Sequence, residues 1–139
     1  MGKKLLDLIT DSMQHLPKDI MYDTVGDILE YGNITDDEAI VICDEIMEKS
    51  LLESNEIILE SMFHAVLLGV ENRNIGGRIH VNNKIIENVE KYSEEILDYI
   101  ITILSYTGNQ KYISTIQEIG YRYQKLDVDE ALKELKRRG

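Results

Sequence analysis

The chain has 139 residues, of which 43% are hydrophobic and 29% are charged, and its formal net charge at pH 7 is −11. This length suffices for one domain with its own core and is too short to expect two. No apolar run approaches the roughly 18 residues that a membrane-spanning helix needs, and a single cysteine excludes an internal disulfide framework. We therefore expect one soluble, cytoplasmic domain without a secretion signal, because the opening MGKKLLDLIT is too polar for a signal peptide.

Apolar residues recur at three- and four-residue spacing along nearly the whole chain, which predicts an all-α protein. The expected elements are a first helix at about 3–15, helical hairpins at about 18–52, 54–92 and 93–125, and a closing helix at about 127–138. Thr35 and Glu38 have the spacing of a capping box at the start of the second helix of the first hairpin. Asp127 and Glu130 have the same spacing at the start of the closing helix.

Glycines mark the expected turns between helices. Gly32, Gly69 and Gly108 each follow an apolar helical pattern, at intervals of 37 and 39 residues. Gly108 suits the left-handed conformation after a helix C-terminus, and Asn109 can cap the helix that follows. The stretch VENRNIGGRIHVNN, residues 70–83, interrupts this regularity, so the second helix of the middle hairpin is expected to be short. Repeated helix pairs predict a stack, because one hairpin cannot bury its apolar faces alone.

The stretch EEILDYIITILSYTGNQKYISTIQEIG, residues 94–120, resembles the closing repeat of HEAT and armadillo-like helical repeat proteins. The resemblance is clearest over residues 93–136 and extends to small bacterial HEAT-like immunity proteins of polymorphic toxin systems. It implies a right-handed stack of about three hairpins, a HEAT-like α-solenoid with an extra helix at each end. It also implies a binding scaffold that has no catalytic residues.

The residue types that carry chemistry are scattered. His15, His64 and His80 have no second histidine or cysteine nearby at metal-ligand spacing. Cys43 lies on an apolar helix face, which is typical of a core thiol rather than a nucleophile. The glycines of NIGGRIH, residues 74–80, lack the spacing of either phosphate-binding glycine motif and indicate a loop. We therefore expect no metal site, no cofactor and no catalytic residues.

The negative charge is concentrated in one part of the chain. Between Asp19 and Glu60 there are thirteen acidic residues and one basic residue, Lys49, so this segment carries −12. Helical spacing predicts an acidic face on each helix of the first hairpin. The candidate partner-binding residues are Asp19, Asp23, Asp27 and Glu30 on its first helix and Asp37, Asp44, Glu45 and Glu48 on its second. Like charges at such spacing destabilise a helix by about 0.2–0.5 kcal/mol per pair.

Two surfaces compete as the partner-binding site. The acidic faces would steer a basic protein into contact, whereas the last hairpin is rich in tyrosine, a common interface anchor. The tyrosines concerned are Tyr99, Tyr106, Tyr112, Tyr121 and Tyr123. A third interpretation is that the acidic residues only keep the protein soluble.

We expect a non-enzymatic inhibitor, and the leading hypothesis is an immunity protein that binds and neutralises a basic toxin domain such as a nuclease. The alternative is a HEAT-like adaptor or regulatory scaffold for a cellular protein partner. An enzyme is the weakest hypothesis, because no convergent set of acid, base, nucleophile or metal ligands occurs in the sequence. Nucleic acid is disfavoured as a partner since its phosphates would be repelled by the negative charge, and no membrane partner is expected.

Overall fold

The computed structural model describes residues 4–139, and helices form all the regular secondary structure of this part of the chain. The all-α prediction is therefore confirmed for these residues. The α-helices are α1 (Leu5–Thr10), α2 (Lys18–Tyr31), α3 (Asp36–Ser50), α4 (Glu56–Asn72), α5 (Asn83–Glu87), α6 (Glu94–Tyr106), α7 (Ile113–Arg122) and α8 (Asp129–Arg138). Short 3-10 helices lie at Asp11–Met13, Val89–Lys91 and Gln110–Tyr112.

Two of the predicted helices can be compared with the structure in detail. The first helix, expected at about 3–15, is α1 followed by the 3-10 helix Asp11–Met13. Its residue 3, like the first residues of the stretch MGKKLLDLIT, lies outside the described residues. α5 has only 5 residues, as the irregular stretch 70–83 predicts.

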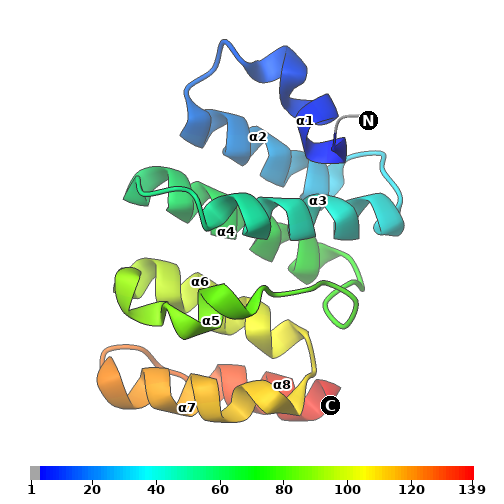
Figure 1. The fold of residues 1–139 in the computed structure, drawn as a ribbon. Helices are drawn as coiled ribbons and strands as arrows, with labels where there is room; N and C mark the ends of the chain where they lie inside the picture. Colours follow the sequence, from blue (N-terminus) through cyan, green and yellow to red (C-terminus); the bar gives the residue numbers. More distant parts are fainter. Residues whose placement is uncertain (1–3) are drawn as a thin grey trace.

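The helices follow one another down a single stack, with α1 near one end and α8 at the other (Figure 1). α2, α4, α6 and α8 pack one on the next and form a central row, in which α2 and α4 share the most extensive contact. α3 packs on both α4 and α1, and α7 packs on α8. The main packing partner of α2 is thus α4, which is not its neighbour in the sequence.

Glycines lie where helices approach one another closely. Gly26 of α2 faces α4, and a methyl group on it would lie 3.3 Å from the Ala65 Cα atom. Gly69 is buried within α4, where a methyl group would lie 3.1 Å from the Cys43 sulfur. The predicted turn at Gly69 is therefore wrong, because the helix continues through this close contact and ends only at Asn72.

Local capping interactions set several helix ends. Thr35 and Glu38 form the predicted capping box: the Thr35 hydroxyl accepts the Glu38 N–H at 3.1 Å, and the Glu38 carboxylate accepts the Thr35 N–H at 2.9 Å. Gly108 has a φ of +66° and follows α6. The Asn109 side chain accepts the N–H of Lys111 at 3.1 Å, so the predicted turn and cap at this point are confirmed.

Two other predicted helix ends have different outcomes. Gly32 follows α2 directly, as predicted, and donates its N–H to the Ile28 carbonyl at 2.7 Å. The capping box predicted for Asp127 and Glu130 is wrong, since α8 begins at Asp129. The Asp127 carboxylate accepts the Asp129 N–H at 3.0 Å, which is the local turn that aspartate favours, and this occupies the oxygen.

The core is one cluster of buried apolar side chains that runs through the stack. The connection between α4 and α5, residues 73–82, contributes Ile75, Ile79 and Val81 to it. This connection, which was expected to be a loop, is therefore anchored to the helices on either side.

One tyrosine in this core has an unpaired hydroxyl. The ring of Tyr92 packs edge-on against Phe63, with the ring centroids 5.7 Å apart and the rings at 84°. Among residues 4–139, its hydroxyl is the one fully buried side-chain polar atom without a hydrogen-bond partner. Burial raises the pKa of Tyr92 to about 12. An unsatisfied polar group of this kind costs about 1–3 kcal/mol.

Replacing Tyr92 with phenylalanine is expected to stabilise the protein by about 1 kcal/mol, because the ring contact with Phe63 stays and the unpaired hydroxyl goes. Urea unfolding of the wild type and of Tyr92→Phe measures the difference. Tyr112→Phe is the control, and its free energy of unfolding is expected to change little. Tyr112 is similarly buried, but its hydroxyl is not a fully buried atom without a hydrogen-bond partner. A loss of stability in Tyr92→Phe would show that the hydroxyl has a partner in solution.

Candidate functional site

The predicted partner-binding residues lie on α2 and α3, and the two helices use their carboxylates differently. Three carboxylates of α3 accept hydrogen bonds from the connection 73–82. The pairs are Asp37 with Arg78 Nη2 at 2.6 Å, Asp44 with the His80 N–H at 2.7 Å, and Glu48 with Asn82 Nδ2 at 2.8 Å. The acidic row of α3 thus holds the long connection against the helix.

The environment of Asp44 agrees with this structural function. Asp44 is half-buried, and burial is the largest cause that raises its pKa, while the N–H and the charge of His80 lower it. Glu45, the neighbour of Asp44, accepts the Leu6 N–H at 3.2 Å and so connects α3 with α1. Each of the four predicted residues on α3 therefore has a hydrogen-bond partner within the chain.

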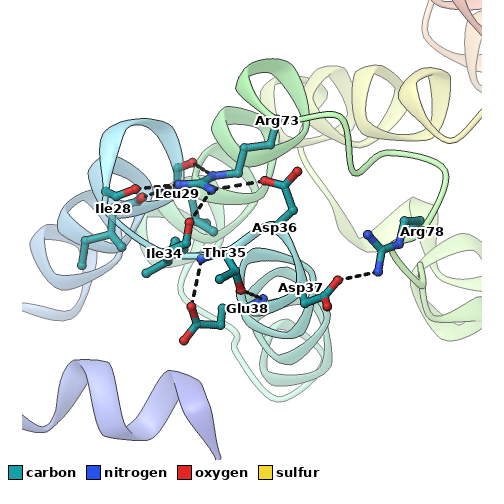
Figure 2. A network of polar contacts seen from close by, with 10 residues as sticks. Ile28, Leu29, Ile34, Thr35, Asp36, Asp37, Glu38, Arg73 and Arg78 are labelled. Carbon is teal, nitrogen blue, oxygen red and sulfur yellow. Dashed lines mark hydrogen bonds and ion pairs between the residues drawn. The ribbon is translucent and has the colours of Figure 1, made fainter.

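Arg73, the first residue of the connection, binds the C-terminal end of α2 (Figure 2). Its side chain is only 12% exposed. Its guanidinium donates to main-chain carbonyls at the end of α2 and just beyond. These are the carbonyls of Leu29 at 2.7 Å, Gly32 and Ile34 at 2.9 Å, and Ile28 at 3.5 Å. Carbonyls at a helix C-terminus lack partners inside the helix and favour a cation, so one arginine satisfies several of them.

The same guanidinium also reaches the start of α3. Arg73 Nη1 lies 3.4 Å from a carboxylate oxygen of Asp36, the first residue of that helix. Figure 2 shows Arg73 between the two helix ends, with the Arg78–Asp37 pair a little farther along the connection. The connection therefore joins the end of α4 to α2 and α3 at several points.

The carboxylates of α2 have a different environment. Asp23 and Asp27 are exposed, and the structure shows no ion pair for either within residues 4–139. Asp19 is half-buried at the start of the helix. Glu30 accepts a long hydrogen bond from Asn72 Nδ2 at 3.4 Å. Asp23 and Asp27 are therefore the exposed carboxylates of the predicted site for which no partner within residues 4–139 is shown.

Packing of the central row brings acidic residues from α4 and α6 to Asp23. The pKa of Tyr99 on α6 is raised, first by burial and then by the nearby charges of Glu60, Asp98 and Asp23. Three helices thus each supply one carboxylate around this tyrosine. The His64 ring of α4 lies 5.4 Å from the Tyr99 ring, centroid to centroid.

We name this surface the acidic–tyrosine face, formed by Asp23, Asp27, Glu60, His64, Asp98 and Tyr99. All of these side chains are exposed except Tyr99, which is half-buried. Glu60 and Asp98, like the two aspartates of α2, have no ion pair shown within the described residues. The face therefore presents four uncompensated carboxylates beside a tyrosine and a histidine.

The face loses its negative character toward α8. Tyr106, two helical turns beyond Tyr99, has the Arg138 guanidinium 4.3 Å from its ring centroid. Arg137 and Arg138 both bind Glu134, and their hydrogen bonds lower the pKa of Glu134 to about 2. Positive charges thus balance the acids at this end of the central row, so the net negative charge of the row itself belongs to α2, α4 and α6.

Helical periodicity alone does not predict the combination of residues at this face. It places Asp23 on one candidate surface and Tyr99 on a competing one in the last hairpin. The structure places both on the same side of the central row, with Glu60 between them in chain order. The local indication of this face in the sequence is the four-residue spacing of Glu60 and His64, which places them one turn apart on the same side of α4.

The described residues offer little for covalent or metal chemistry. Cys43 is fully buried, and burial raises the pKa of its thiol to about 12. Within residues 4–139 no three His, Cys, Asp or Glu side chains gather closely enough to hold a metal ion. In the same residues, no helix has both the length and the apolar character to cross a membrane. What the acidic–tyrosine face can do is bind cations through carboxylates and an aromatic ring.

Replacing Arg73 with glutamine is expected to lower the free energy of unfolding by about 2–4 kcal/mol, because several carbonyls lose a charged donor. Arg78→Gln is the matched control: Arg78 lies in the same connection and also pairs with an aspartate of α3, but both side chains of that pair are exposed. The free energy of unfolding of Arg78→Gln is expected to fall by less than about 1 kcal/mol. Equal losses for both variants in urea unfolding would contradict the importance given to Arg73.

The function of this face has to be inferred from its side chains. No protein-family model, curated protein or solved structure matches the chain.

Proposed function

We propose that the protein is a non-enzymatic binding protein that docks a basic protein partner on its acidic–tyrosine face. One observation carries the proposal: the charges of Asp23, Glu60 and Asp98, which are exposed and come from three different helices, all act on Tyr99, whose ring lies 5.4 Å from that of His64. Three acids of α3, in contrast, accept hydrogen bonds from the connection 73–82. Binding a cationic protein would relieve the repulsion among the free carboxylates.

The physical properties of this face suit a protein partner. Unpaired carboxylates on packed helices create a local negative field that accelerates the approach of a positive surface. Tyr99 can supply apolar contact area with a polar tip, which is a common combination at the centre of interfaces. The side chain loses little conformational freedom on binding because it is already half-buried against α6 and His64.

We infer further that the stack is a HEAT-like, right-handed α-solenoid. The central row supports this, because each even-numbered helix packs on the next and the chain ends lie far apart along the stack. Helix pairs stacked in this way bury a continuous core and leave long faces open for binding. The short α5 and the anchored connection 73–82 are departures from a regular repeat.

The leading version of this function is an immunity protein that neutralises a basic toxin domain, such as a nuclease, in the cytoplasm. The small size, the resemblance of residues 94–120 to HEAT-like immunity proteins and the acidic–tyrosine face support it. The alternative is an adaptor for a cellular protein. A toxin gene immediately beside the gene of this protein would favour the first version, and its absence would favour the second.

The test compares two triple variants that change the net charge equally. Asp23→Lys, Glu60→Lys and Asp98→Lys alter the acidic–tyrosine face, whereas Glu87→Lys, Glu118→Lys and Asp129→Lys alter exposed acids on α5, α7 and the start of α8. Association with the toxin domain encoded beside the gene is measured at two salt concentrations. The face variant is expected to associate at least about tenfold more slowly, with a weaker dependence on salt.

The control variant is expected to associate within about twofold of the wild-type rate. Circular dichroism checks that both variants keep their helical content. If the two triple variants slow association to the same extent, the effect comes from total charge, and the proposed face is not the binding site. Failure of the wild type to protect cells from the toxin would reject the immunity version while leaving the adaptor version open.

A further inference from the structure

A basic hollow lies away from the acidic–tyrosine face. It has a volume of about 560 Å³ and contains four lysines, although the chain as a whole carries −11. The four are Lys4 before α1, Lys49 in the last turn of α3, Lys84 in α5 and Lys91 in the 3-10 helix that follows. The hollow shares no helix with the acidic–tyrosine face, and it brings together residues that are up to 87 positions apart in the sequence.

The positive charge of the hollow is only partly compensated. Two carboxylates also line it, so four lysines face two acids. Asp7 binds Lys49 at 3.1 Å, and Glu48 already accepts a hydrogen bond from Asn82. No ion pair within residues 4–139 is shown for Lys4, Lys84 or Lys91, and these three side chains are exposed.

The four lysines and two carboxylates leave an excess of two positive charges around one concave site, and an anion between the lysines would offset that excess. Each ammonium is a compact charge with three donors that can rotate toward phosphate oxygens. The volume lies within the range of small-molecule sites. The lysines line one hollow and do not form an extended row, which fits a compact anion better than a nucleic-acid strand.

We propose that this hollow binds a small, multiply charged phosphate compound that contains a pyrophosphate group. Lys4, Lys84 and Lys91 contact its oxygens, and Asn88 in the lining offers a neutral donor. Because the lysines belong to separate elements, the bound anion joins the start of α1 to α5 and the turn after it. The site stands apart from the proposed function, and its test does not use the protein partner.

Inorganic pyrophosphate is the probe for this site, added to the full chain without metal ions. Calorimetry is expected to show saturable binding of one equivalent with a dissociation constant below about 1 mM. The midpoint of thermal unfolding should rise with pyrophosphate concentration, because the anion binds the folded state. Sodium chloride at matched ionic strength is the reference and is expected to produce a smaller rise.

A pair of double variants with the same charge change locates the site. Lys84→Gln with Lys91→Gln alters the hollow, and Lys111→Gln with Lys125→Gln is the control. The control is closely matched, since Lys91 and Lys111 each lie over the ring of the following tyrosine, at 5.2 and 5.1 Å from its centroid. The hollow variant is expected to bind pyrophosphate about tenfold more weakly, and the control within about twofold of the wild type.

Two results would overturn the proposal. One is a rise in the unfolding midpoint that sodium chloride reproduces fully, because it would reflect general screening. The other is an equal loss of pyrophosphate affinity in both double variants, because it would reflect net charge and not the hollow. Circular dichroism of each variant separates either result from unfolding.

Discussion

The arrangement of this protein depends on the contact between Arg73 and the C-terminal end of α2. The guanidinium is largely buried, donates to four main-chain carbonyls and also reaches Asp36 at the start of α3. A hydrogen bond from a charged donor contributes about 1.5–3 kcal/mol, which exceeds the value of an exposed ion pair. Since Arg73 follows α4 directly, this contact holds three helix ends together and fixes where the connection 73–82 begins.

From that point the connection runs along α3 and determines which acids remain free. Asp37, Asp44 and Glu48 bind it, so their charges stabilise the fold, whereas Asp23 and Asp27 stay open to solvent. The connection is a loop, as predicted, and it is held in place by hydrogen bonds to α3 and by the core contacts of its apolar side chains. The structure thus divides the candidate acids into carboxylates that bind the connection and carboxylates, Asp23 and Asp27, for which no partner within residues 4–139 is shown.

Packing of the central row determines which side chains lie near the exposed carboxylates of α2. Close approach at Gly26 and Gly69 lets α2, α4 and their neighbours pack tightly, and tight packing keeps side chains on different helices at fixed separations. The charges of Asp23, Glu60 and Asp98 therefore all act on Tyr99, while four lysines line a hollow on other elements. The molecule has two surfaces of opposite charge, and each is preorganised for a ligand of the opposite sign.

The sequence by itself determined the features that depend on a few neighbouring residues. The helical character, the Thr35–Glu38 capping box, the turn at Gly108 and the short α5 were all predicted, because each rests on spacing and capping within about one or two turns. The acidic residues of α2 and α3 were also identified as candidates. Only the tertiary structure decided that Gly69 lies inside a helix, since an apolar stripe followed by glycine is compatible with both a turn and a close contact. It also decided which acids of α3 bind the connection, because those partners lie 34 to 41 residues apart. It decided as well that Lys4, Lys49 and the pair Lys84 and Lys91 line one hollow, and no local pattern predicts contacts between such distant parts of the sequence.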